Sequence, residues 1–359
     1  MTEIAELLVK KDDLSKMRLA RRPAPALQVG EILARVDRFA LTANNVTYGV
    51  VGERIGYWNF FPAEEGSGII PVWGFADVVE SKSDEIKTGE RLYGYFPMGT
   101  HLVMRVGNTR PDRMIDAAPH RAALPPVYNS YARVGAEPHF DKSLEDERML
   151  LFPLYATSFC LYDFLLDNKW FGASQIVIGS ASSKTAIGLA YALKDDPSAP
   201  VSIGLTSKRN EAKVKALRLY DSVVTYDDLA AIDASKPTAI VDMSGDGKVL
   251  SDLHKHLGDN MKYTANVGLT HFTENSMGPN FIHERSAMFF APGHIQKRAG
   301  DWGPGVFEKK AFVFWKEAAL RSRDWLSIDH VSGVEAIEGA FREVLEGKLP
   351  ADKGLVVVL

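Results

Sequence analysis

The chain has 359 residues, of which 46% are hydrophobic and 25% charged, with 42 basic and 46 acidic side chains. The resulting net charge of −4 excludes the strongly basic surface that is typical of nucleic-acid-binding proteins. The single cysteine, Cys160, excludes an intramolecular disulfide and any zinc site built from several cysteines. At about 100–200 residues per domain, this length predicts two domains, or one large domain with an inserted partner. We expect a small-molecule substrate as partner and leave a homodimer open.

The N-terminal residues Met1–Glu6 lack the basic residues and the apolar run of a signal peptide. No uninterrupted apolar stretch approaches the ~20 residues that a membrane-spanning helix needs. We therefore expect a cytoplasmic protein with no membrane partner and no nucleic-acid partner.

Residues 1–150 read as short strands separated by glycine and proline. The expected strands lie at Ile32–Leu41, Gly68–Val79, Arg91–Phe96 and Thr100–Val106. Their β-branched and aromatic residues at short intervals predict a small, mostly antiparallel barrel or sandwich. The segment Gly107–Ala136 is rich in proline, arginine and asparagine and is interpreted as a surface loop.

After Phe152 the pattern changes to strands that alternate with helices. The strands are expected to begin near Ile176, Val201, Val223, Ala239, Tyr263 and Met288. Strands separated by crossover-length segments indicate an α/β fold with a doubly wound parallel sheet. Six such strands fit a dinucleotide-binding domain, whose ligand lies at the carboxyl ends of the strands.

The C-terminal part has helical patterns at Val306–Arg321 and Val334–Leu345 and an apolar strand at Gly354–Leu359. A strand this short must pair with an existing sheet, and we expect it to return to the N-terminal domain. The predicted domains are therefore residues 1–150, residues 151–295, and residues 296–359 as the return to the first domain.

The segment Gln175–Lys194 is the most informative part of the second domain. An apolar strand ends in it, small residues form a turn, and a helix begins around Ser183. Small residues let a backbone approach a pyrophosphate, whose charge the helix N-terminus stabilises. The candidate phosphate-binding residues are Gly179, Ser180, Ala181, Ser182, Ser183, Lys184 and Thr185.

This turn lacks the strict glycine fingerprint, since Ala181 and Lys184 occupy positions where that pattern has glycine. An ATP-type P-loop fits less well, because Ile178 and Ser183 would have to be glycines. The alternative is an ordinary strand-to-helix turn capped by Ser182 or Ser183. We favour a cofactor phosphate because the turn belongs to a run of six expected strands, which is the context that such a motif requires.

The end of the second strand predicts which dinucleotide would bind. The candidate residues there are Thr206, Ser207, Lys208 and Arg209, and no acidic residue occurs before Glu211. A ribose 2′-hydroxyl is usually held by an acidic residue and a 2′-phosphate by cationic ones, so the sequence favours NADPH over NADH. The alternative is that these two basic residues only begin a solvated helix.

Two further strand ends would face the nicotinamide half of such a cofactor. Their small residues Ser244, Gly245, Val267 and Gly268 could expose backbone groups to it. Asp242, close to one strand end, is interpreted as a cap or turn former and not as a catalyst.

The order of these parts resembles the medium-chain dehydrogenase/reductase superfamily over nearly the whole chain. Gly89–Gly94 is similar to that family's Gly-Asp-Arg-Val-x-Gly turn, and Val334–Lys348 followed by Lys353–Val358 is similar to its closing helix and last strand. The chain also resembles a divergent bacterial branch known mainly as a domain of unknown function. The resemblance implies a GroES-like barrel, a Rossmann domain and a C-terminal return to the barrel.

The resemblance also implies that zinc is absent. The position that matches the first zinc ligand of the family's alcohol dehydrogenases falls near Thr42–Asn44, where no cysteine stands. The histidines are scattered without HExxH spacing, and we expect His254 and His256 to be exposed on a polar helix. We therefore predict no metal site. A short-chain reductase is excluded because no Tyr-x-x-x-Lys pair occurs.

Without zinc, the resemblance points to the quinone and enoyl reductases, in which the cofactor carries the hydride and the protein supplies orientation and a proton. The matching region contains Tyr48, our candidate proton donor, with Asn44 or Asn45 orienting the substrate. The alternative is a buried structural tyrosine. The aromatic groups Tyr57–Phe61 and Tyr128–Tyr131 either line a substrate site or serve packing or a dimer contact.

The sequence thus predicts an NADPH-dependent, zinc-independent reductase of an activated C=C or C=O bond in a small apolar or aromatic substrate. The alternative is a non-catalytic dinucleotide-binding sensor or scaffold, because fold alone does not establish turnover. A third alternative is that the altered turn has lost the cofactor.

Overall fold

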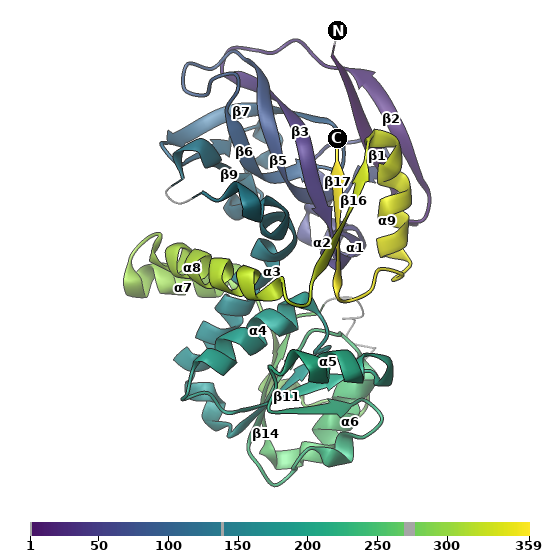
Figure 1. Ribbon diagram of the computed structural model, residues 1–359, viewed down its shortest axis with the longest axis vertical. Helices are drawn as coiled ribbons and strands as arrows, with labels where there is room; N and C mark the ends of the chain where they lie inside the picture. The colour runs from purple at the N-terminus through teal and green to yellow at the C-terminus, as the bar shows by residue number, and fades with distance from the viewer. Residues whose placement is uncertain (1, 138–139, 269–276) are drawn as a thin grey trace. The chain divides into compact units, whose positions relative to one another are not determined.

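The computed structural model describes residues 2–137, 140–268 and 277–359 (Figure 1). The chain forms two compact units: unit 1 comprises Met1–Leu150 and Leu326–Leu359, and unit 2 comprises Leu151–Trp325. The boundary after the second domain lies at residue 325 and not at 295, because α7 (Ala291–Trp302) and α8 (Val306–Ser322) belong to unit 2.

Unit 1 is built around a closed antiparallel barrel (Figure 1). Its strands, in order around the barrel, are β3 (Glu31–Leu41), β5 (Pro71–Ser81), β6 (Arg91–Pro97), β9 (Ser130–Arg133), β8 (Arg113–Asp116) and β7 (His101–Arg110). The barrel closes where β7 pairs with β3. The final strand β17 (Lys353–Val358) pairs with β3, and β16 (Ser327–Ser332) lies beyond it. This arrangement confirms the expected GroES-like barrel.

The side chains on the inner face of the strands form the barrel core. In β3, Ile32, Ala34 and Val36 point into the core, as the period of two requires. Helix α9 (Ile337–Leu345) adds its apolar face to the same core through the fully buried Phe341 and its neighbours. The remaining elements of unit 1 include a small sheet, β2-β1-β4, and two short helices that follow β3. Their bounds are β1 (Glu3–Lys10), β2 (Met17–Pro23), β4 (Ser67–Ile69), α1 (Ala43–Val50) and α2 (Gly52–Ile55).

The segment Gly107–Ala136 is not the surface loop that its composition predicts. It contains β8 and β9, which complete the barrel. It also contains an ion pair between Arg121 and Asp116, whose side chains are each 1% exposed and lie 3.3 Å apart. Polar composition was misleading here because the charges are buried as a pair, which lowers the cost of burying each.

Unit 2 contains a parallel sheet of six described strands in the order β12-β11-β10-β13-β14-β15 (Figure 1). Their bounds are β10 (Gln175–Gly179), β11 (Val201–Thr206), β12 (Ser222–Thr225), β13 (Thr238–Asp242), β14 (Met261–Asn266) and β15 (Ser286–Met288). Each begins within two residues of its expected start, which confirms the doubly wound Rossmann arrangement. The crossovers include α4 (Lys184–Asp195), α5 (Glu211–Leu217) and α6 (Gly247–Leu257).

Helix α3 (Glu145–Asp167) is the longest apolar helix. Together with the turn before it, the stretch Lys142–Asp167 is long and apolar enough by length and composition to cross a membrane, the one such helix within the described ranges. Of its most apolar 18 residues, 56% are buried inside the protein, as in the core helix of a soluble protein.

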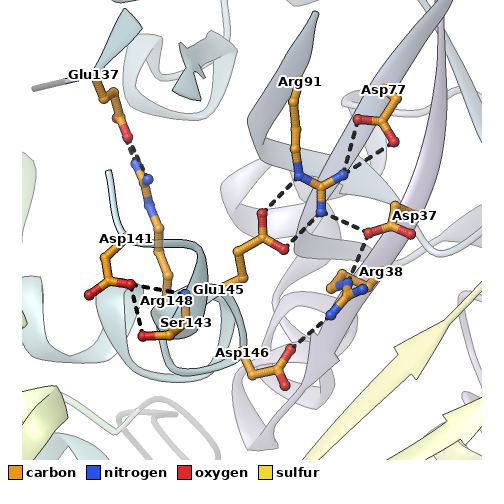
Figure 2. A network of polar contacts seen from close by, with 10 residues as sticks. All are labelled: Asp37, Arg38, Asp77, Arg91, Glu137, Asp141, Ser143, Glu145, Asp146 and Arg148. Carbon is orange, nitrogen blue, oxygen red and sulfur yellow. Dashed lines mark hydrogen bonds and ion pairs between the residues drawn. The ribbon is translucent and has the colours of Figure 1, made fainter. Parts of the chain in front are cut away.

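The first turn of α3 is attached to the barrel by a polar network, shown in Figure 2. Arg91 on β6 contacts three carboxylates: Asp37 at 2.7 Å, Asp77 at 3.0 Å and Glu145 at 2.8 Å. These carboxylates come from β3, β5 and α3, so one guanidinium joins three elements to its own strand. A second ion pair links Arg148 of α3 to Glu137, which precedes the helix, at 2.6 Å.

Candidate functional site

The turn between β10 and α4 has the geometry expected from its small residues. β10 ends at Gly179, and Ser180 adopts a left-handed backbone with φ of 52°. The Ser183 hydroxyl accepts a hydrogen bond from the Ala186 N–H at 3.3 Å and so caps α4. The predicted helix start at Ser183 is confirmed.

Side chains from neighbouring elements tie this turn down. The Ser180 N–H donates to the Tyr226 hydroxyl at 3.1 Å, and the Tyr220 hydroxyl donates to the Ala181 carbonyl at 2.8 Å. Sequence reasoning missed both tyrosines. Tyr226 directly follows β12, a neighbour of β11 on the same sheet, and the rule that ligands meet carboxyl strand ends could have singled it out.

The ends of β10 and β13 approach each other closely at Gly179. A Cβ atom at this position would lie 2.7 Å from Oδ1 of Asp242, so only glycine fits without a shift. Oδ1 of Asp242 accepts hydrogen bonds from the backbone and hydroxyl of Ser244, and Oδ2 accepts from the Gly245 N–H. Burial raises the pKa of Asp242, and these hydrogen bonds oppose that shift. The interpretation of Asp242 as a turn former is confirmed.

The end of β14 joins the same cluster. The N–H groups of Val267 and Gly268 both donate to the Asp242 carbonyl, at 2.8 and 3.1 Å. A Cβ at Gly268 would lie 2.6 Å from the Met243 carbonyl oxygen. The structure therefore brings the candidates at these two strand ends together with Gly179.

The end of β11 carries the remaining candidates of unit 2. Thr206 is buried, and the Ser207 hydroxyl oxygen is buried with no hydrogen-bond partner among the described residues. Lys208 forms an exposed ion pair with Glu211 at 2.6 Å, while the Arg209 side chain is exposed. Hydrogen bonds from Lys208 and from a second lysine lower the pKa of Glu211 to about 2.

A second buried oxygen lies at the end of β14. Asn266 is 1% exposed, and its Oδ1 atom has no hydrogen-bond partner in the described part of the chain. Sequence reasoning did not single out this residue, because an asparagine within an apolar strand resembles a turn signal. Two carboxyl strand ends of the sheet thus each hold a buried polar oxygen that is free to accept a hydrogen bond.

In unit 1, the structure separates the roles of the two candidate asparagines. Oδ1 of Asn45 accepts from the Thr42 N–H at 2.7 Å, and its Nδ2 donates to the Pro71 carbonyl at 2.8 Å. Asn45 therefore holds the start of α1 in place. Asn44 remains the candidate for substrate orientation, and it lies one turn before Tyr48 on α1.

Tyr48 lies on α1 with its side chain buried. The Trp73 indole Nε1–H donates to its hydroxyl oxygen at 3.3 Å. Burial raises the pKa of Tyr48 well above its usual value and Tyr57 adds to the shift, while hydrogen bonds with Trp73 and Asn44 oppose it. At ordinary pH this hydroxyl keeps its proton, as a donor must.

Aromatic rings surround Tyr48. Its ring centroid lies 4.7 Å from that of Tyr57 and 5.6 Å from that of Tyr95. The hydroxyls of Tyr57 and Tyr128 are 3.1 Å apart, so the two aromatic groups noted in the sequence meet here. Sequence reasoning missed Trp73 and Tyr95, which face each other across β5 and β6. The signal that could have identified them is that aromatic residues alternate along both strands, at Trp73 and Phe75 on β5 and at Tyr93 and Tyr95 on β6.

The expectation that His254 and His256 are exposed is wrong: His256 is half-buried, with its Nε2 2.7 Å from the Ile232 carbonyl oxygen. His254 is fully buried: the Ile282 N–H donates to its Nδ1 at 2.9 Å, and its Nε2 lies 2.9 Å from the Thr264 hydroxyl. It was expected to be exposed because α6 is polar overall, but it lies on the apolar face of that helix beside Leu253 and Leu257. Across the described residues, no group of three or more histidine, cysteine or carboxylate side chains is placed to hold a metal ion.

Comparison with protein families gives one match. The model of a family described as "Protein of unknown function (DUF2855)" matches residues 39–350. No curated protein matches the chain at a significant level.

Several solved structures share the whole fold. CurA from Vibrio vulnificus is 14% identical, with 99% of this chain and 98% of that chain covered and a TM-score of 0.63. A mutant form of enoyl thioester reductase from Candida tropicalis is 10% identical, with both chains fully covered and a TM-score of 0.60. The quinone oxidoreductase from Coxiella burnetii is 14% identical, with both chains fully covered and a TM-score of 0.57. These neighbours confirm the expected fold, a GroES-like barrel together with a Rossmann domain.

Proposed function

Since the chain belongs to DUF2855, a family of unknown function, we propose its activity from the site itself: an NADPH-dependent, zinc-independent reductase of an activated C=C or C=O bond. The observation that carries this proposal is the pair of buried oxygens, on Ser207 and Asn266, at carboxyl strand ends of the parallel sheet. A buried polar atom without a partner costs about 1–3 kcal/mol, which a bound ligand recovers. In this fold, that edge of the sheet is where a dinucleotide binds.

The residues around these oxygens fit a dinucleotide. Gly179 and Gly268 lie where a Cβ would collide with Asp242 and with the Met243 carbonyl, so no side chain projects from these two positions. The N-terminus of α4 follows Gly179, and its N–H groups favour a phosphate. We assign Gly179–Thr185 to the pyrophosphate. We assign Ser244, Gly245, Val267 and Gly268 to the nicotinamide half through groups other than their N–H groups, which already donate to Asp242.

Arg209 supports NADPH as the preferred dinucleotide. Its exposed guanidinium follows Ser207 by two residues, and cationic groups are what a ribose 2′-phosphate requires. Glu211, the nearest acidic residue, is held by Lys208 and Lys215. Two of the structures that share this fold contain this type of dinucleotide. One is CurA in complex with NADPH, and the other is an Etr1p mutant in complex with NADP and crotonyl-CoA.

In the proposed reaction, bound NADPH would supply the hydride. Tyr48 donates the proton, and its raised pKa keeps that proton in place until the substrate develops negative charge. Asn44 orients the substrate oxygen. The rings of Tyr57, Tyr128 and Trp73 provide an apolar surface beside the donor, which suits a small apolar or aromatic substrate.

One observation favours the alternative that the turn has lost its cofactor. The Ser180 N–H, which a phosphate would use, already donates to the Tyr226 hydroxyl. For the cofactor to use this N–H, Tyr226 must move aside or share it.

Titration of the protein with NADPH and NADH, followed by fluorescence, tests binding. We expect NADPH to bind more tightly than NADH, and Arg209→Ala to weaken NADPH about tenfold or more while leaving NADH unchanged, because one charge-assisted hydrogen bond to phosphate is lost. Lys213→Ala is the matched control, since it removes one positive charge from α5 nearby. Equal affinities for NADPH and NADH would remove Arg209 from cofactor recognition, and no binding of either at millimolar concentration would contradict the proposal.

Turnover is tested separately with a panel of enones, quinones and aldehydes, followed by the loss of NADPH absorbance. We expect reduction of at least one class, with Tyr48→Phe depressing turnover while NADPH affinity stays intact. Tight NADPH binding without reduction of any member would favour the non-catalytic sensor or scaffold.

A further inference from the structure

We propose that Trp73 is a positioning residue that fixes Tyr48 as the proton donor, by giving the Tyr48 hydroxyl a partner that can only donate. This inference rests on the proposed reductase function and identifies a residue outside the sequence-based candidates. The two side chains belong to the same unit but to different elements, α1 and β5.

The indole of Trp73 is held in place by rings on neighbouring strands. It stacks on Tyr93 with centroids 5.7 Å apart and an interplanar angle of 25°, and it contacts Tyr95 at 5.3 Å. Both tyrosines lie on β6, and Tyr95 is the direct cross-strand partner of Trp73. The orientation of the indole N–H is therefore set by packing against two rings of β6.

The chemistry of the indole determines the direction of the hydrogen bond. A tryptophan side chain has one N–H donor and no acceptor. At 3.3 Å the Tyr48 oxygen must accept, so Trp73 leaves the hydrogen of this hydroxyl unused. A neutral partner that could both donate and accept, such as a serine, would leave this direction undecided.

The same contact lowers the barrier to proton transfer. When the substrate accepts hydride at one atom of its activated bond, the other atom gains negative charge and takes the proton of Tyr48. The O–H bond of Tyr48 breaks, its electron pair stays on the phenolate oxygen, and a C–H or O–H bond forms on the substrate. Burial disfavours this phenolate, and the donors from Trp73 and Asn44 stabilise it until water returns a proton.

The variant Trp73→Phe tests this assignment, because it keeps an aromatic ring and removes the N–H. We expect kcat to fall about 10–100-fold. This is equal to or somewhat smaller than the usual effect of removing one hydrogen-bond donor from a developing anion. KM and NADPH affinity should stay within twofold, roughly, because the hydrogen bond is stronger in the transition state than in the ground state. Tyr93→Phe is the matched control: it keeps the ring that stacks on Trp73 and removes a hydroxyl that donates to the Arg148 carbonyl.

A second measurement does not depend on turnover. In protein labelled with [ζ-13C]tyrosine, the NMR resonance of Tyr48 is assigned by its absence in Tyr48→Phe. We expect this resonance to move in Trp73→Phe and to stay in place in Tyr93→Phe. A resonance that stays in place in Trp73→Phe would overturn the proposal.

The two measurements separate this proposal from the function on which it rests. If the wild-type protein reduces a substrate and Trp73→Phe does so with equal kcat, the positioning role is wrong and the reductase function stands. If the resonance moves but the wild-type protein reduces no substrate, the reductase function is wrong and with it the role of Trp73 in catalysis.

Discussion

At the scale of single residues, the environment decides which titratable groups respond to pH. His254 is enclosed by α6 and the segment around Ile282, and both ring nitrogens have partners. Because the Ile282 N–H donates to Nδ1, the imidazole is neutral there and Nε2 carries its hydrogen. Burial, with smaller contributions from Arg285 and His283, lowers the pKa of His254 to about 4.

This lowered pKa predicts a loss of stability in acid. An unfolded histidine titrates near pH 6.5, so between about pH 6.5 and 4 the unfolded chain binds a proton that the folded chain refuses. The free energy of unfolding should therefore fall as pH falls through this window, by an amount on the order of 3 kcal/mol when pH 4 is reached. Above pH 6.5 the contribution is constant.

Denaturant unfolding of the wild type and His254→Gln across pH 4–7 measures this effect. We expect the variant to be less stable at pH 7 and to show a shallower loss of stability toward pH 4. His256→Gln is the control, because it removes an imidazole from the same helix outside the buried face. Parallel pH profiles for all three proteins would contradict the assignment to His254.

At this scale the sequence identified candidate residues for the site, but not the residues that contact them. Tyr48 and Asn44 were singled out from a short segment, and the structure places them together, though their catalytic roles stay predictions. Trp73 was missed because its contact with Tyr48 spans 25 residues and depends on where β5 lies against α1. Such a contact is set by strand register, which a single sequence does not state.

At the scale of elements, the first turn of α3 depends on Arg91. Glu145 is 3% exposed, and its charge is compensated by this guanidinium, as Figure 2 shows. Burial raises the pKa of Asp37, but hydrogen bonds from Arg91 and Arg38 outweigh it, so the net pKa of Asp37 is lowered. The network holds carboxylates from three elements near one another, which only a shared cation allows.

We therefore expect Arg91→Met to destabilise unit 1. Glu145 is the buried carboxylate of the three, at 3% exposure, and leaving its charge without a cation costs about 3–5 kcal/mol. Arg133→Met is the matched control: Arg133 is also 20% exposed but pairs with one half-exposed carboxylate, Glu90, so the loss should be about 1 kcal/mol or less. Chemical denaturation followed by circular dichroism compares the two variants. Equal losses would show that the network contributes no more than a single surface pair.

Elements were predictable where their pattern was local. The strands of unit 2 follow apolar runs bounded by small residues, and the sequence located all of those described. The segment around β8 and β9 was not recognised, because these strands have four residues each and their pairing partners lie elsewhere in the barrel. Short strands carry too few alternating positions to be distinguished from a loop.

At the scale of the whole molecule, unit 1 is made from two distant parts of the chain. β17 pairs with β3 on one side and with β16 on the other, and it buries Leu355, Val356 and Val357 in unit 1. The sequence predicted this return, because an isolated apolar strand must find a sheet. The sequence placed the end of the second domain at 295, 30 residues too early, because the pattern of a helix such as α8 does not show to which unit the helix belongs.

Deletion of residues 353–359 should unfold unit 1 while unit 2 keeps its structure. Each buried aliphatic side chain contributes about 1.5–3 kcal/mol, so losing three approaches the whole stability of a typical domain. Limited proteolysis with mass spectrometry measures the outcome: cuts should concentrate before residue 150 and after residue 326. Val358→Ala, at a half-exposed position of the same strand, is the control and should remain resistant. A deletion variant that resists cleavage in unit 1 would contradict this expectation.

Because unit 1 is formed by two separate segments of the chain, it also determines the order in which the units can fold during synthesis. Ribosomes deliver the chain from its N-terminus, and domains fold as units as they emerge. Residues 1–150 leave the ribosome before unit 2, yet Arg38–Leu41 of β3 lacks its partner β17 until all of unit 2 has followed. Unit 2, encoded in the middle, is thus the first part that can complete its fold. Until then the closed barrel keeps one open strand edge, at Arg38–Leu41 of β3, which makes this edge the part of unit 1 most in need of protection by a chaperone.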